Sequence, residues 1–251
     1  MAVGLLAGTI VLRPYVFAFL LAFLAIAWRD VGPRRAPAWL VLGFAVAFGA
    51  ELSSTRVGFP FGLYHYTGAT ADRELFLSNV PFFDPLSFPF LAYASWCLAG
   101  RALRRSRGLS VVALSALLMA LLDVVIDPLA VRGERWFLGH LFDYPEAGVY
   151  FGVPLSNFAG WFLVGFVIVG GFLALTPTEP GPRPAPGVAL YYGVLAFNLA
   201  LTLWIGEWML FATGLTLHAA AGVMLWRAAR PQSHAGPSPA LSGPLPLRGE
   251  G

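Results

Sequence analysis

Long apolar runs recur along the chain, and short segments rich in arginine, proline and glycine separate them. The runs are roughly 15 to 20 residues long, close to the ~20 apolar residues with which a helix crosses the hydrocarbon core of a membrane. They predict seven helices, over residues 10–28, 36–52, 83–100, 109–127, 154–175, 187–205 and 207–226. We therefore expect an all-α protein, a polytopic transmembrane bundle of about seven helices, within a range of six to eight.

Two junctions affect the number of helices. Arg13-Pro14 interrupts the first apolar run, and Gly206-Glu207 leaves a very short connection between the last two helices. From Pro231 onward the chain is rich in Pro, Gly and Ser and has few large apolar residues, so it has too little to bury in a core. We expect one bundle domain over residues 1–230 and a disordered tail over residues 231–251.

The composition excludes a soluble domain, because 58% of the 251 residues are apolar and only 12% are charged. The net charge of +3 does not indicate nucleic-acid binding, since every basic residue is an arginine and the arginines lie mainly in short loops. The positive-inside rule places the arginine-rich loops and the C-terminus in the cytoplasm, and the two long loops, residues 53–82 and 128–153, outside. We expect an integral protein of the bacterial inner (cell) membrane, surrounded by lipid and without a nucleic-acid partner.

Acidic and amide residues lie near one end of each predicted helix from the second to the seventh. They are Glu51, Asp84, Asp123, Asp127, Asn157, Asn198 and Glu207. Because successive helices run antiparallel, all of these positions fall at the same end of the bundle, opposite the arginine-rich loops. An ionisable residue within a membrane span needs a partner or a function. For Asp84 and Glu207, a favourable interaction with the helix dipole is an equally good explanation.

The spacing of Asp123 and Asp127 indicates function. Four residues apart, the two carboxyls stack on one helix face, at a C-terminal end where the helix dipole disfavours acids. Glu51 also ends a helix, but Arg56 is close enough in sequence to form a structural ion pair with it. His65 and His140, both in the long loops, lack the spacing of a metal motif, and we expect neither a metal nor another cofactor.

The two long loops resemble each other. Glu51 is followed by Arg56, Gly58 and later Val80-Pro81, and Asp127 is followed by Arg132, Gly133 and later Val153-Pro154. Both loops are also rich in Gly, Tyr and Phe. The similarity suggests a duplicated helix–loop–helix unit, with chance similarity as the alternative.

Four segments resemble a known family of integral-membrane carotenoid biosynthesis proteins. They are residues 51–66 (ELSSTRVGFPFGLYHY), 79–84 (NVPFFD), 122–133 (LDVVIDPLAVRG) with Trp136, and 148–161 (GVYFGVPLSNFAGW). The family includes carotenoid 1,2-hydratases of the cyanobacterial type and archaeal bisanhydrobacterioruberin hydratases, and the similarity extends over residues 12–226. The resemblance implies a hydro-lyase that adds water across the terminal C1–C2 double bond of an acyclic (ψ) carotenoid end group, giving a tertiary alcohol without a redox cofactor.

Hydration of a trisubstituted alkene requires a proton donor, a base for the incoming water, and aromatic faces that stabilise a tertiary carbocation. Asp123 and Asp127 fit the first two roles, one as donor and one as base, since two like charges so close together do not both ionise cheaply. The candidate catalytic residues are Asp123, Asp127, Glu51, Asp84 and Asn157, the last of which would orient the water. The candidate substrate-binding residues are Tyr64, Tyr66, Trp136, Tyr150, Trp161, Arg56 and Arg132.

Two other functions agree with the same residues. A carotenoid end-group cyclase begins with the same protonation, but an internal alkene captures the cation in place of water. A membrane transporter or lipid-binding protein would use the clustered acids as a proton or ion relay.

Overall fold

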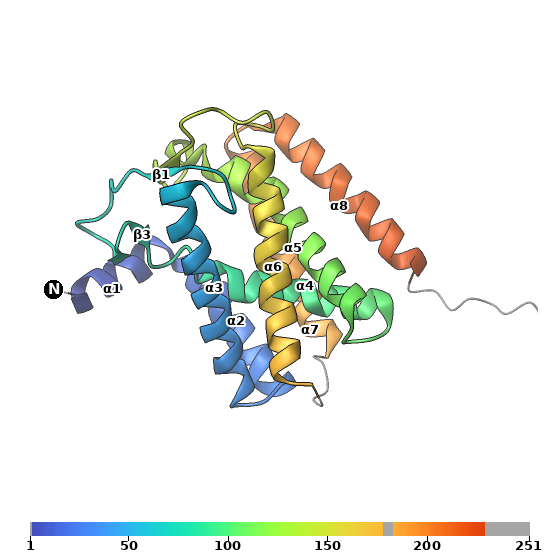
Figure 1. Ribbon diagram of the computed structural model, residues 1–251. Helices are drawn as coiled ribbons and strands as arrows, with labels where there is room; N and C mark the ends of the chain where they lie inside the picture. Colours follow the sequence, from blue (N-terminus) through green and yellow to red (C-terminus); the bar gives the residue numbers. More distant parts are fainter. Residues whose placement is uncertain (1, 178–182, 229–251) are drawn as a thin grey trace, which may run out of the picture.

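The computed structural model describes residues 2–177 and 183–228, which form a bundle of helices (Figure 1). The helices are α1 (Ala2–Leu12), α2 (Pro14–Asp30), α3 (Arg35–Val57), α4 (Ser87–Leu103), α5 (Leu109–Ala130), α6 (Leu155–Leu175), α7 (Pro184–Trp204) and α8 (Trp208–Ala228). Five of them, α3 and α5 to α8, are long and apolar enough to cross a membrane, and α1 with α2 makes a bent sixth candidate. The predicted all-α transmembrane fold is confirmed. Arg230 and the predicted tail, residues 231–251, lie outside the described residues.

The first predicted helix, residues 10–28, corresponds mainly to α2, and a separate helix, α1, precedes it. α1 and α2 meet at Arg13-Pro14 with a bend of 90°, and Pro14 occupies the first turn of α2, where a missing N–H costs nothing. At the other junction, Gly206 has a φ of 76°, which lets the chain turn directly from α7 into α8. The two breaks therefore arise where the sequence interrupts the apolar pattern.

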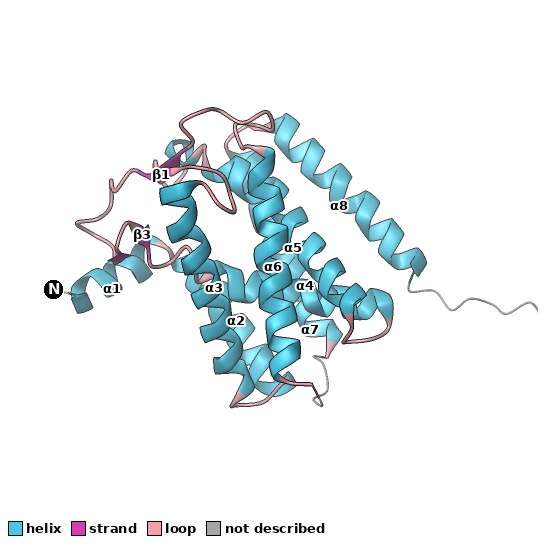
Figure 2. Ribbon diagram, in the orientation of Figure 1, coloured by secondary structure: helices cyan, strands magenta, loops and turns pink. Residues whose placement is uncertain are grey.

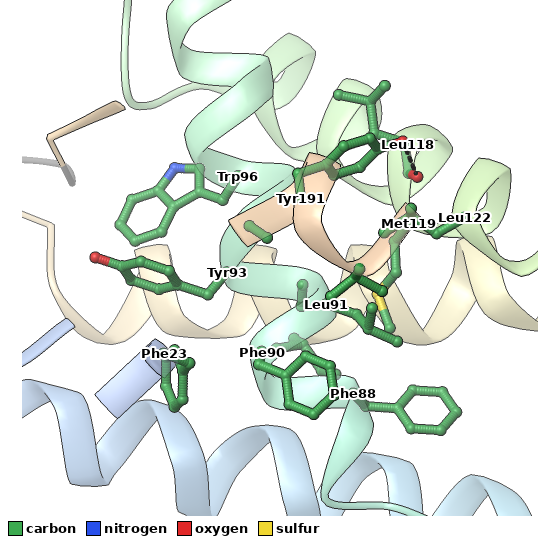
Figure 3. Packing of buried hydrophobic residues seen from close by; sticks show 14 of the residues in the cluster. Phe23, Phe88, Phe90, Leu91, Tyr93, Trp96, Leu118, Met119, Leu122 and Tyr191 are labelled. Atoms are coloured by element: carbon green, nitrogen blue, oxygen red, sulfur yellow. Dashed lines mark hydrogen bonds between the residues drawn. The ribbon is translucent and has the colours of Figure 1, made fainter. Parts of the chain in front are cut away.

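α4 is the central helix of the bundle, although it is only 17 residues long. It contacts α2, α3, α5, α6, α7 and α8, and its residues from Phe88 to Ala99 are all buried. Figure 3 shows the large side chains that surround it, among them Phe23 of α2 and Tyr191 of α7. The indole of Trp39 on α3 donates a hydrogen bond of 2.8 Å to the carbonyl of Pro89. This packing fixes the position of α4, and Asp84 lies in the turn just before it.

Two long loops, residues 58–86 and 131–154, cover one end of the bundle, which we call the loop end. They contain short strands, β1 (His65–Tyr66), β2 (Phe76–Leu77), β3 (Val80–Pro81) and β4 (Phe142–Asp143), and a 3-10 turn, η1 (Gly133–Arg135) (Figure 2). β2 pairs with β3 within the first loop. β1 pairs with β4 in antiparallel register, Tyr66 opposite Phe142, so the two loops are joined directly to each other.

A buried ion pair ties the loops to the α1–α2 bend. The Arg13 guanidinium donates to both carboxylate oxygens of Glu74 in the first loop, at 3.1 and 2.9 Å, and to the carbonyl of Leu138 in the second loop at 2.7 Å. The side chains of Arg13 and Glu74 are 1% and 0% exposed. The sequence showed Arg13 only as an interruption of an apolar run, whereas in the structure it anchors both loops.

Candidate active site

The loop end holds a small polar cavity to which four different segments contribute one acid or amide each. Glu51 comes from α3, Asp84 from the turn before α4, Asp127 from α5 and Asn157 from α6. The cavity has a volume of about 30 Å³, which is room for one or two water molecules. We call it the polar cavity. Asp123, the remaining candidate acid, is fully buried one turn below Asp127 on α5 and does not line it.

Asn157 forms hydrogen bonds to both aspartates of α5. Its amide nitrogen donates to Asp123 Oδ2 at 2.7 Å and to Asp127 Oδ2 at 2.6 Å. The indole of Trp161 donates to the same Asp127 oxygen at 3.3 Å. The other oxygen of Asp123, Oδ1, is buried and has no hydrogen-bond partner among the described residues. Asp127 is therefore surrounded by N–H donors, while half of the Asp123 carboxyl is unsatisfied.

Tyr66 connects the other two acids. Its hydroxyl oxygen lies 2.6 Å from Asp84 Oδ2 and 3.1 Å from Glu51 Oε2. A phenol carries one hydrogen and can donate only one of these bonds, so the second requires a proton on a carboxyl. Glu51 is 2% exposed, and its second oxygen, Oε1, has no partner within the described part of the chain. An unpaired buried carboxylate is costly, which makes Glu51 the better place for that proton.

The environment of Asp84 keeps it close to titration at physiological pH. Burial raises its pKa to about 6, against the opposing effects of the Tyr66 hydrogen bond and of the positive charge of Arg13. Burial also raises the pKa of Tyr66 well above its usual value, so the phenol stays protonated and remains able to pass a proton between its neighbours.

Aromatic rings make up the rest of the polar cavity. They are Phe61, Tyr64, Tyr66, Phe88, Phe142, Tyr144 and Trp161. Phe88 and Trp161 stack with their centroids 4.3 Å apart. Phe61 reaches α6 because residue 160 is a glycine, where a Cβ atom would lie 2.8 Å from the Pro60 carbonyl oxygen. Such a wall offers several π faces to a cation.

A second cavity, of about 90 Å³, adjoins the first. Most of its wall is apolar, with Tyr15, Ile126, Trp136 and other side chains from α2, α4, α5 and the second loop, and Asn198 of α7 is among its few polar groups. We call it the apolar cavity. Asp84, Asp127, Phe142 and Trp161 line both cavities, so two carboxyls stand where the polar space meets the apolar one.

Not all candidate residues reach these cavities. Trp136 lines the apolar cavity, whereas Tyr150 packs on Phe151 and Phe158 and lines neither. Arg56 is exposed and donates to Ser78 at 3.3 Å, and no ion pair between it and Glu51 is found in the described structure.

Arg132 also lies outside both cavities. It pairs with Glu207 at 3.1 Å and donates to the carbonyl of Phe151, and Arg135 pairs with the same glutamate. The arginines of the second loop thus hold the start of α8. Glu207, which opens that helix, serves this ion pair and does not line the cavities.

Four aromatic residues of the polar cavity were not predicted from the sequence: Phe61, Phe88, Phe142 and Tyr144. The similarity of the two loops could have identified Phe88. Phe88 lies four residues after Asp84, just as Trp161 lies four residues after Asn157. Asp84 and Asn157 each lie three residues after the proline of a Val-Pro pair. In the structure these matched positions face one polar cavity, and the two loops pair through β1 and β4. The arrangement agrees with the suggested duplication of a helix–loop–helix unit, which stays a prediction.

The family model described as "Carotenoid biosynthesis protein" matches residues 3–226. The chain belongs to this family. Over 138 residues it is 36% identical to a protein named bisanhydrobacterioruberin hydratase from Haloarcula japonica, a match that covers 54% of this chain and 44% of the relative. The chain thus spans less than half the length of that curated relative. No solved structure matches it.

Two acids, Asp84 and Asp127, lie at the boundary between the polar cavity and the apolar cavity. In residues 2–177 and 183–228, no group of three His, Cys, Asp or Glu side chains is arranged to hold a metal ion. The chemistry available from these side chains is proton transfer by carboxyls and a phenol, next to aromatic faces.

Proposed function

We propose that this protein is a carotenoid hydratase, which adds water across the terminal C1–C2 double bond of an acyclic (ψ) end group and forms a tertiary alcohol. One observation carries the proposal: Asp84 and Asp127 lie in the wall shared by a polar cavity sized for water and an apolar cavity suited to an isoprenoid end. The hydratase name of the Haloarcula japonica relative supports it. The reaction is redox-neutral and, in this proposal, needs no cofactor.

In this mechanism the proton comes from Glu51, near the end of α3. Glu51 stores it, the Tyr66 hydroxyl relays it, and Asp84 delivers it to C2 of the alkene. The O–H bond of Asp84 breaks as the new C–H bond forms, which leaves a tertiary cation at C1. Phe88 and Trp161, stacked beside both acids, present π faces to that cation.

Asp127 of α5 activates the water in this mechanism. Two N–H donors on Asp127 Oδ2, from Asn157 and Trp161, stabilise its negative charge. A water molecule in the polar cavity attacks C1, and its proton passes to Asp127 as the C–O bond forms. The sequence alone favoured an acid and a base within the Asp123/Asp127 pair. The structure favours Asp84 as the acid, because Asp123 lines neither cavity.

The experiment is expression in a host that makes lycopene, an acyclic carotenoid, with mass spectrometry of the pigments. A mass gain of one water per reacted end supports the proposal. A product of unchanged mass but altered retention indicates cyclisation, and unchanged pigment at verified expression favours transport or lipid binding. Asp127→Asn is the inactive comparison, and Asp72→Asn, whose side chain is 80% exposed, is the matched control.

A further inference from the structure

A series of aromatic rings leads from the apolar cavity to the outside of the bundle. Tyr15 of α2, which lines that cavity, stacks on Phe197 of α7 at 5.3 Å and contacts Phe137 of the second loop at 5.5 Å. Phe197 also contacts Phe19, one turn further along α2, at 5.6 Å. Phe137 lies 6.2 Å from Trp204 at the end of α7. We call these five residues the α2–α7 seam.

Part of the seam is exposed on the outside of the bundle. Phe137 and Trp204 are 49% and 65% exposed, and Tyr15, Phe19 and Phe197 are each partly buried. Lipid tails are as apolar as the side chains they touch, so the hydrophobic effect alone gives no reason to gather aromatic rings there. Rings prefer offset or edge contacts with other π systems, and a conjugated polyene is a π system along its whole length.

The direction of the seam suits a long chain whose end reacts at the loop end. Tyr15 and Phe19 lie on successive turns of α2, which runs away from the apolar cavity for 17 residues. At 1.5 Å per residue this is about 25 Å, comparable with the thickness of the hydrocarbon core. A polyene lying against α2 and α7 would pass Phe19 and Phe197 and stay within the membrane. Phe137 and Trp204, at the loop end, would flank the point where one end of the polyene turns inward past Tyr15.

We propose that the α2–α7 seam binds the conjugated chain of the carotenoid while its ψ end occupies the apolar cavity. The inference rests on the proposed function, and it assigns substrate binding to five residues outside the candidate set predicted from the sequence. The seam would favour long conjugated substrates over short isoprenoids that carry the same end group.

The test compares seam variants with variants of exposed rings elsewhere. Phe197→Leu and Trp204→Leu keep an apolar side chain but remove a ring from the seam. Phe162→Leu on α6 and Trp208→Leu on α8 are the controls, since these residues are 37% and 66% exposed and lie outside the seam. All four are purified in detergent at matched amounts and assayed with an acyclic carotenoid and with a short, non-conjugated isoprenoid that has the same terminal alkene.

We expect each seam variant to raise KM for the carotenoid about threefold to tenfold, as for loss of one aromatic contact, with kcat nearly unchanged. KM for the short isoprenoid should stay the same, and the control variants should match the wild type with both substrates. If the wild type hydrates the carotenoid and the seam variants have wild-type KM values, the seam is ordinary lipid-facing surface and the inference is wrong.

A second measurement separates the seam from the proposed reaction. Carotenoid that copurifies with each variant from a pigmented host is quantified by its absorbance, which does not depend on turnover. Pigment lost from the seam variants but kept by the controls, in the absence of any hydration, upholds the seam and overturns the hydratase proposal. Equal pigment in all variants, with normal hydration, overturns the seam alone.

Discussion

Replacing Tyr66 with Phe tests the proposed proton relay most directly. The ring and its packing against Tyr64 and Phe142 remain, but the hydroxyl that lies 2.6 Å from Asp84 and 3.1 Å from Glu51 is lost. No other hydrogen bond between described residues links the two carboxyls. We expect the hydration rate to fall by on the order of 10², as for loss of a general acid.

The same change should move the pH dependence in a defined direction. Asp84 must be protonated to act, so the wild-type rate should decline about tenfold per pH unit above the Asp84 pKa of about 6. The Tyr66 hydrogen bond lowers that pKa. A hydrogen bond to a charged group contributes about 1.5 to 3 kcal/mol, and one pH unit corresponds to about 1.4 kcal/mol. In Tyr66→Phe the alkaline limb should therefore lie about one to two pH units higher.

The assay is a pH–rate profile with purified protein and an acyclic carotenoid in detergent. Tyr93→Phe is the matched control, because it removes a hydroxyl that donates to Asp30, a residue at the opposite end of α2 from the cavities, at 3.1 Å. A Tyr66→Phe protein with the wild-type rate and an unshifted alkaline limb would refute the relay. The acid would then have to be sought in the Asp123/Asp127 pair, as the sequence alone suggested.

Further outcomes follow from the same structure. Asp127→Asn should lower hydration by on the order of 10² or more at unchanged expression, because Asn is cheaper to bury than Asp but cannot accept the proton of water; product formation and protein level are both measured. Glu74→Gln leaves its arginine partner charged and buried, so thermal unfolding in detergent should show a loss of about 3 to 5 kcal/mol; an unchanged Tm would contradict this. A reporter inserted near Ala71 should be external and one fused after Arg230 cytoplasmic, and both on one side would disprove the topology. Treatment with a chelator should leave hydration intact, whereas loss and recovery with added metal would show that a metal is required.

Antiparallel helices explain why the sequence predicted the acids and the amide of the polar cavity. Once the helices alternate in direction, residues near the ends of consecutive helices must share an end of the bundle, so Glu51, Asp84, Asp127 and Asn157 could be grouped without knowing their packing. The acids also stand out, because charge within a membrane span is costly. The composition, the spacing and the helix directions were sufficient for this part of the site.

The loops were less predictable, because their contacts join residues far apart in sequence. Arg13 and Glu74 are separated by 61 positions, and only the path of the first loop brings them together. Arg56 follows Glu51 by five residues, but α3 continues to Val57 and the arginine side chain bonds to Ser78. The apolar cavity depends on the α1–α2 bend and on the fold of the second loop, neither of which leaves a periodic pattern in the sequence.

The two similar segments, one after Val80-Pro81 and one after Val153-Pro154, differ at positions to which the proposed mechanism gives different roles. Asp84 of the first segment corresponds to Asn157 of the second, and Phe88 corresponds to Trp161. Asn157 and Trp161 donate N–H bonds to Asp127 that favour its charged form against the effect of burial, whereas Asp84 and Phe88 supply no such donors to Glu51. Among the described residues, the hydrogen bond to the Glu51 carboxyl comes from the Tyr66 hydroxyl alone, which can carry a proton onward. An amide cannot relay a proton as a phenol can, so one side of the site is suited to deliver protons and the other to accept them. A symmetric site would have had two acids or two bases, and hydration of an alkene needs one of each.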